Sequence, residues 1–307
     1  MQSLVEPVLR FTQYALLLGL FGWSAFWILG LQSLHWLKFE RQPVFFAILT
    51  ALAAPVASSA LMLISIAAMM GVSVVALDGP MIEMMIFGTD MGYAFIARTG
   101  LLVVALAFLL TIKRRVALVF AAGCFGSALV TLAWSGHAAA SEGGVGLVHR
   151  LNNGIHLIGA GLWFGAIGWF LFLTFQCRQD PDGIRAQAVL KEMHAFAPLG
   201  VALVAVVAFT GTINSHLIFG VQNLAMTLYS SYGILLAMKL ALVAAMVGFG
   251  AHHARVSRSA SRRIEGVASG SARTFSALRR TLLAEFLLGI FVTGLVAVLG
   301  TMSPTLM

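Results

Sequence analysis

The chain has 307 residues, of which 60% are hydrophobic and only 10% are charged, and its net charge is +8. With a mean hydropathy of +0.95, it has too few polar groups to coat a soluble globule of this length. The composition excludes a soluble enzyme and predicts an all-α, polytopic membrane helix bundle with lipid as its solvent.

Long uncharged stretches mark the predicted membrane spans, because a bilayer-crossing helix needs about 20 mostly apolar residues and a charge at its centre is costly. We expect about eight transmembrane helices, in chain order at roughly residues 8–33, 44–72, 92–112, 115–136, 149–177, 193–217, 228–252 and 278–301. The uncharged stretch 193–238 is too long for one helix, and Gln222 and Asn223 beside Gly220 predict a turn within it.

Lysine and arginine residues are distributed unevenly between the two sides of this predicted bundle. One side holds only Arg10, Arg98 and Arg150, whereas the other holds Lys38, Arg41, Lys113, Arg114, Arg115, Arg178, Arg185, Lys191, Arg255, Arg258, Arg262, Arg263, Arg273, Arg279 and Arg280. The positive-inside rule therefore predicts that the second side is cytoplasmic and that both termini are periplasmic.

The segment 253–277 is expected to be a cytoplasmic basic loop. Its basic residues are interleaved with Ser, Ala and Gly rather than with aromatic residues. This composition is typical of a solvated segment that is attracted to anionic lipid, and we expect no nucleic-acid partner.

Four histidines fall on the predicted periplasmic side. His137 ends one helix, His149 and His156 open the next, and His216 ends the helix after that. The i, i+4, i+7 spacing of His149, Asn153 and His156 puts them on one helix face. We expect one metal site formed by His137, His156 and His216. His149 is a further candidate, although a histidine at a helix end can also simply lie in the membrane interface.

Methionines gather on the same side, and Met69, Met70, Met84 and Met85 are candidate ligands. Thioether sulfur favours Cu(I), and imidazole suits both oxidation states of copper. Zinc more often comes with Cys or with a His and carboxylate set. Copper is therefore the predicted metal, while each methionine alone has a plain interpretation as apolar filling.

Three charged residues fall inside predicted helices. Lys239 and Glu285 are expected to approach each other, directly or through water, because either charge is costly to bury alone. A structural clamp is the expected role, with proton coupling as the alternative. Arg98 is expected either to anchor a carboxylate such as Asp90 or Glu83, or to reach the outer lipid headgroups.

Several motifs resemble the copper resistance D family (CopD/PcoD) over roughly residues 90–300. They are Ser135-Gly136-His137-Ala138, His156-Leu157 leading into Gly161-Leu162-Trp163-Phe164-Gly165, Thr210-Gly211, and Tyr232-Gly233 with Lys239. The resemblance implies an eight-helix copper-handling protein of the bacterial inner membrane, often working with a periplasmic copper-binding protein of the CopC type. It favours copper passage toward the cytoplasm, although resistance operons place the family among efflux parts.

The expected function is copper transport or copper homeostasis and resistance, with capture at a periplasmic His/Met site. The sequence contains no Gly-x-x-x-x-Gly-Lys-Ser/Thr stretch, so we expect no ATP-driven step by this chain. Two alternatives stay open. One is a membrane cytochrome that holds haem through a pair of these histidines. The other is an assembly factor that binds metal without transporting it.

Overall fold

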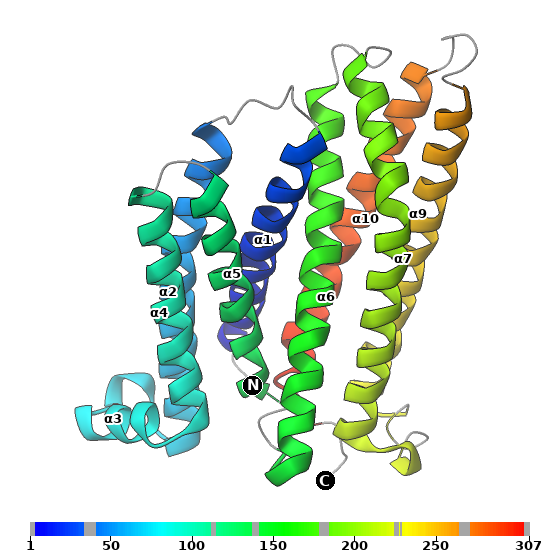
Figure 1. Cartoon of the computed structure of the whole chain (residues 1–307). Coiled ribbons are helices and arrows are strands. Elements are labelled where there is room, and N and C mark those ends of the chain that lie inside the picture. The colour runs from blue at the N-terminus through cyan, green and yellow to red at the C-terminus, as the bar shows by residue number, and fades with distance from the viewer. Residues whose placement is uncertain are drawn as a thin grey trace.

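The computed structural model of the chain is a bundle of long helices (Figure 1), and it describes residues 4–33, 41–111, 115–136, 141–177, 184–223, 227, 229–263 and 271–303. The helices are α1 (Val5–Ser33), α2 (Arg41–Met70), η1 (Val74–Ala76), α3 (Gly79–Phe87), α4 (Asp90–Thr111), α5 (Arg115–Val130), η2 (Thr131–Trp134), α6 (Gly143–Gln176), α7 (Ile184–Phe219), η4 (Val221–Asn223), α9 (Ser231–Arg263) and α10 (Ser271–Leu299). Eight of them are long and apolar enough to cross a membrane, which confirms the predicted polytopic bundle.

Both chain termini lie at the end of the bundle that carries α3 (Figure 1), which we call the α3 end. Short helix α3 runs across the ends of α2 and α4 rather than through the bundle. It begins where it does because the Asp78 carboxylate accepts a hydrogen bond from the Met81 backbone N–H at 2.9 Å, with Pro80 in the first turn.

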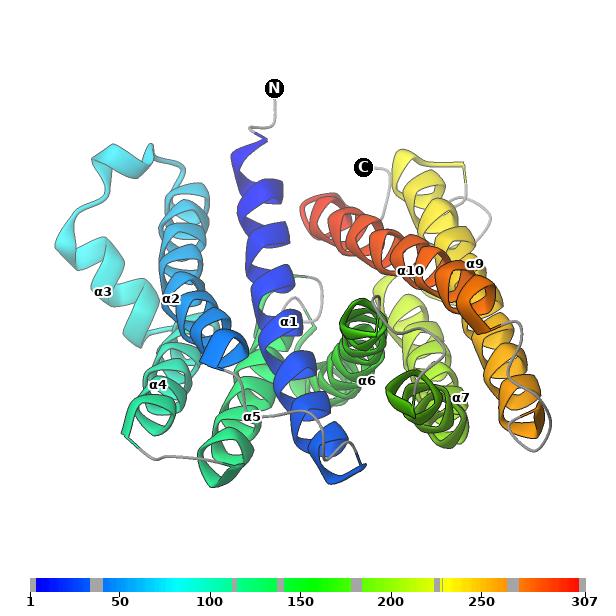
Figure 2. The ribbon, with the colours of Figure 1, turned by 90° about the horizontal axis from the view of Figure 1, so that it is seen from above.

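Helices α1 and α6 lie at the centre of the bundle (Figure 2), and glycines allow their backbones to touch. A Cβ atom added at Gly22 would lie 2.4 Å from the Gly161 carbonyl oxygen and 2.7 Å from the Gly165 Cα atom. Small residues at such a crossing allow van der Waals packing that larger side chains would prevent.

Two apolar clusters pack on either side of this central pair. One joins α1 and α6 to α2, α4 and α5, with Leu17, Leu102 and Phe125 at its core. The other joins them to α7, α9 and α10 and contains Trp169 and Leu278. Because α1 and α6 contribute residues to both clusters, these two helices connect the two halves of the bundle.

The helices continue further than the charge pattern predicted. Helix α7 begins at Ile184 rather than near residue 193. Helix α9 runs to Arg263 and α10 begins at Ser271, so both extend into the segment 253–277 that was expected to be a loop. These extensions still bury apolar residues: Ala186, Val189 and Leu190 in α7, and Phe275 in α10, belong to the core. An amphipathic helix can continue beyond the lipid when one face remains buried.

Candidate functional site

Helices α6 and α7 meet near the α3 end along a line of polar side chains, which we call the α6–α7 seam: Asn152, Asn153 and His156 on α6, and Thr210 and Asn214 on α7. The Asn152 amide donates to the Thr210 carbonyl and to the Asn214 side-chain oxygen, both at 2.8 Å. The Asn214 amide in turn donates to the Asn153 side-chain oxygen at 3.3 Å. These bonds fix the register of the two helices and hold the seam together.

The hydrogen bonds of His156 determine which ring nitrogen carries its proton. The Thr210 hydroxyl donates its only proton to the Val206 carbonyl at 2.6 Å, and it lies 2.9 Å from His156 Nδ1. With that proton on Val206, the hydroxyl oxygen accepts from Nδ1–H in the neutral imidazole, which is the tautomer that this geometry favours. The lone pair then belongs to Nε2, and a metal-binding histidine is commonly oriented by such a bond through its other nitrogen.

Two of the motifs that resemble the copper resistance D family, those that contain His156 and Thr210-Gly211, meet at the His156 ring. A Cβ atom added at Gly211 would lie 3.3 Å from His156 Cε1, so the Thr210-Gly211 pair both bonds the ring and leaves space for it. Lys239 of α9 interacts electrostatically with the same imidazole. Residues from α6 and α7 that are far apart in the sequence thus meet at one ring.

The structure does not bring the other predicted histidine ligands to His156. His149 is 2% exposed and its Nδ1 lies 3.1 Å from the Ser141 hydroxyl. His216 is exposed, and two residues along an α-helix from the seam residue Asn214 correspond to a rotation of about 200°. His137 lies outside the described residues, within which no group of three His, Cys, Asp or Glu side chains could hold a metal ion. An approach of His137 to His156 therefore stays a prediction, whereas His216 lies on another face of α7.

The predicted methionine ligands divide into separate environments. Met70 and Met85 pack in an apolar cluster between α2, α3 and α4, whereas Met84 is exposed on α3. Met69 lines a pocket of about 670 Å³ at the α3 end, together with Met62 of α2 and Met91 of α4, which also belong to that apolar cluster. Sequence reasoning did not single out Met62, which lies two helical turns from Met69.

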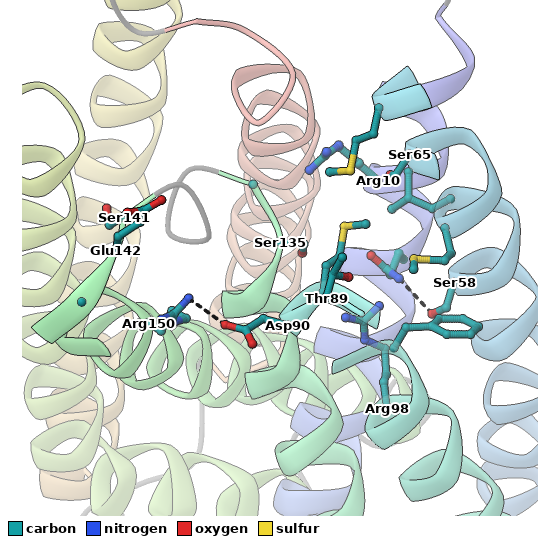
Figure 3. Close-up of a pocket in the computed structure, with 18 residues that line it drawn as sticks. Arg10, Ser58, Ser65, Thr89, Asp90, Arg98, Ser135, Ser141, Glu142 and Arg150 are labelled. Carbon is teal, nitrogen blue, oxygen red and sulfur yellow. Dashed lines mark hydrogen bonds and ion pairs between the residues drawn. The ribbon is translucent and has the colours of Figure 1, made fainter. Parts of the chain in front are cut away.

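Three arginines line the same pocket (Figure 3). Arg150 pairs with Asp90 at 3.5 Å, and Arg10 pairs with Glu6 at 2.9 Å. Arg98 is only 5% exposed and donates through Nε to the Thr131 hydroxyl at 2.8 Å. Neither expectation for Arg98 is met, because Asp90 is engaged by Arg150 and a buried guanidinium does not reach the headgroups.

The expected approach of Lys239 to Glu285 is also wrong. Glu285, 1% exposed on α10, lies 3.2 Å from Nδ1 of His253, and His253 Nε2 lies 2.9 Å from the Thr281 hydroxyl oxygen. His253 is fourteen residues after Lys239 on α9, a rise of about 21 Å at 1.5 Å per residue. Glu285 therefore pairs with a histidine near the opposite end of the bundle.

Sequence reasoning missed the residues that orient His156. The amides Asn152 and Asn214 carry no charge to mark them, and their role depends on which helix packs against α6. Thr210 was noticed only as part of a short motif. Its bond to His156 can be inferred from the two motifs only when α7 is known to pack against α6.

The comparisons with known proteins agree with these motifs. The model of the copper resistance protein D-like N-terminal domain matches residues 1–147, and the copper resistance protein D model matches residues 190–299. The chain is 32% identical to Copper resistance protein D of Pseudomonas syringae pv. tomato, over 99% of this chain and 98% of that protein.

Two further relatives match over shorter lengths. Inner membrane protein YebZ of Escherichia coli (strain K12) is 34% identical over 38% of each chain. Copper transport protein CutJ of Bacillus subtilis (strain 168) is 28% identical over 53% of this chain and 27% of that protein. No solved structure matches the chain significantly. Since both family models match and the first relative is similar along its whole length, this chain belongs to the copper resistance protein D family.

Proposed function

We propose that this membrane protein moves copper across the bacterial inner membrane, toward the cytoplasm, and that His156 is a ligand on its path. The observation that carries the proposal is the orientation of His156 by Thr210, which leaves the Nε2 lone pair for a metal. Relatives named for copper resistance and copper transport support copper as the substrate.

The α3 end is the proposed entrance, and it would face the periplasm. Its described basic residues are few, whereas the opposite end carries the basic ends of α9 and the start of α10. Met62, Met69 and Met91 line the pocket at this end and would offer soft sulfur to Cu(I). His137 follows the pocket-lining residue Gly136 in sequence, and it completes the proposed capture site.

In the proposed site, the charge of Lys239 lowers the affinity of His156 for copper, so that copper binds only transiently. A positive charge that acts on His156 opposes a metal cation bound to the same ring. A transport site needs binding that is strong enough for entry and weak enough for release, as in channels. In this proposal Lys239 lowers the occupancy of copper at the seam and promotes its release toward the opposite end.

A separate periplasmic copper-binding protein of the CopC type is the proposed copper donor, although free copper could serve the same site. Supply and transport are separable in an experiment. Vesicles that contain only this chain should accumulate copper from a buffered copper solution, and addition of a donor should raise the initial rate without changing the dependence on His156.

Copper uptake in cells that lack the endogenous protein tests the proposal. Wild-type chain should restore uptake, and His156→Ala should not, while His216→Ala, which changes an exposed histidine on the same side, should retain it. Equal uptake by the wild type and His156→Ala would contradict the proposal. Uptake that is restored by none of the chains would favour an assembly factor instead.

Orientation is tested by cysteine labelling after replacement of Cys124 and Cys177 by serine. Val75→Cys, at a side chain that is 96% exposed beside α3, should react with an impermeant maleimide in intact cells. Arg258→Cys, exposed near the end of α9, should react only after the membrane is permeabilised. The reverse pattern would invert the proposed direction of transport.

The cytochrome alternative requires two histidines that face each other from different helices. Within the described residues, His149 and His156 both belong to α6, and His216 is exposed. A Soret band in the purified protein that is lost in His156→Ala would favour haem over copper at this position.

A further inference from the structure

The pocket at the α3 end contains a buried positive charge that the described protein groups do not neutralise. Arg98 is 5% exposed, lines the pocket and points into it (Figure 3). Its described hydrogen bonds go to Thr131 alone: Nε to the hydroxyl at 2.8 Å and Nη2 to the carbonyl at 3.4 Å. Within the described residues, Arg98 forms no ion pair with a carboxylate.

The two carboxylates that line the pocket do not compensate for this charge. The Asp90 carboxylate is 71% exposed and lies 3.5 Å from Nη1 of Arg150. Glu142 lies at the start of α6, where it precedes the first helical residue. Arg150 itself keeps a buried Nε that has no hydrogen-bond partner among the described residues. The pocket therefore has an excess of unused cationic donors.

A third guanidinium extends this cationic wall. Arg10 directs Nε and Nη2 to Glu6, at 3.0 and 2.9 Å, and Glu6 does not line the pocket. Its Nη1 lies beside Gly136, where an added Cβ atom would be 3.7 Å from it. Gly136 has φ = +74°, a conformation that favours glycine.

Leaving a guanidinium unpaired in a buried site costs several kcal/mol, and the usual remedy is an anion that accepts its hydrogen bonds. The hydroxyl groups of Ser58 and Ser65 also line the cavity and could donate to the same anion. Leu61, Met62 and Phe95 form an apolar part of its wall. The cavity of about 670 Å³ is far larger than one small ion needs.

We propose that this pocket binds an organic phosphate, with its phosphate oxygens on Arg98 and its organic part against the apolar wall. The phosphate could belong to the headgroup of an anionic phospholipid or to a small phosphate ester in solution. Both sources present the same oxygens to Arg98, and both differ from copper in charge. The same pocket lies at the proposed copper entrance, where an anion on Arg98 would offset the positive charge that opposes a copper cation. The proposal itself stands on the arginines of the pocket and does not depend on the route of copper.

Binding is measured on the full-length purified protein in a neutral detergent. Native mass spectrometry follows phosphatidylglycerol, with diacylglycerol as the control that lacks phosphate, and calorimetry follows sn-glycerol 1-phosphate. Arg98→Gln should weaken binding about tenfold or more, because a hydrogen bond to a charged group is lost. Arg98→Lys should weaken it less. Arg255→Gln, at an exposed arginine near the opposite end, should leave it unchanged.

A second variant tests the pocket without changing Arg98, in case the Arg98 variants misfold. Ser65→Phe fills the pocket from α2 while all three arginines remain, and it should also abolish binding. Binding of phosphatidylglycerol only would identify a lipid site, and binding of glycerol phosphate as well would identify a site open to solution. The proposal is overturned if neither phosphate binds, if diacylglycerol binds equally well, or if Arg98→Gln and Ser65→Phe bind like the wild type.

Discussion

Nδ1 of His156 and the hydroxyl oxygen of Thr210 lie 2.9 Å apart across the α6–α7 seam. The bond links a histidine on α6 to a threonine on α7, and the two residues are 54 positions apart in the sequence. Because the threonine hydroxyl lies closest to the Val206 carbonyl, at 2.6 Å, the bond favours the imidazole tautomer with its proton on Nδ1. The proposed copper chemistry rests on that selection.

Thr210→Val should weaken copper binding without unfolding the protein. Valine keeps the shape of threonine but cannot accept from Nδ1–H, so the ring loses the bond that orients it. Loss of such a second partner of a metal-bound histidine costs about 10-fold to 100-fold in affinity. Thr210→Ser retains the hydroxyl and is the matched control. Equal affinities of the Val and Ser variants in a chelator competition would show that the tautomer is not set by Thr210.

Lys239→Met should raise copper affinity, because it removes a positive charge that acts on His156. A gain of about tenfold corresponds to the removal of roughly 1.4 kcal/mol of repulsion. The same variant should transport more slowly, since copper would leave the seam less readily. Lys239→Arg keeps the charge and should bind copper like the wild type. An affinity for copper that is unchanged or lower in Lys239→Met would contradict the proposed role of the lysine.

His253 and Glu285 should be energetically coupled, whereas Lys239 and Glu285 should not. Removal of one member of the buried His253–Glu285 pair leaves the other without its partner. The losses in unfolding free energy of the two single variants should therefore add up to more than the loss of the double variant. The coupling expected for residues in contact is about 0.5–3 kcal/mol. The unfolding free energies of His253→Ala, Glu285→Gln and the double variant measure it.

Lys239→Met combined with Glu285→Gln serves as the control cycle. Residues that share no partner and are well separated show additive effects within about 0.5 kcal/mol. Strong coupling in this cycle, with none between His253 and Glu285, would mean that α9 and α10 pack in a different register.

Gly22→Ala should destabilise the bundle strongly, because its new methyl group would lie 2.4 Å from the Gly161 carbonyl oxygen of α6. The clash is with backbone, so α1 and α6 would have to separate at the central crossing. Gly19→Ala, one turn earlier on α1, meets nothing within 4 Å and is the matched control. It should be neutral or slightly stabilising, since alanine favours a helix by about 0.5–1 kcal/mol over glycine. Thermal unfolding in detergent that affects both variants equally would contradict the close crossing.

The membrane spans could be predicted because charges are costly in lipid and therefore mark the ends of the apolar stretches. The same pattern could not predict how far helices continue outside the lipid. In α7, Ala186, Val189 and Leu190 keep one face buried while Arg185 and Lys191 provide the charges that suggested a loop. The positions of charged residues mark the polar face of such a helix but do not reveal its buried apolar face.

The ion pairs were harder to predict than the helices. Lys239 and Glu285 were paired because both are charges inside spans, but pairing also depends on the height of each residue in the bundle. The structure places Glu285 opposite His253 rather than Lys239. The hydrogen bonds of the candidate site were equally hard to predict, because Asn152 and Asn214 meet only where α7 packs on α6.

The most direct test of the proposed copper site is a Cu(I) titration of the purified full-length protein against a competing chelator, repeated for single histidine variants. His156→Ala should lose the tight copper site, whereas His216→Ala should retain it because His216 is exposed on another face of α7. Binding by the wild type should weaken as pH falls, because the metal needs an unprotonated imidazole. Unchanged affinity and stoichiometry in His156→Ala would contradict the account.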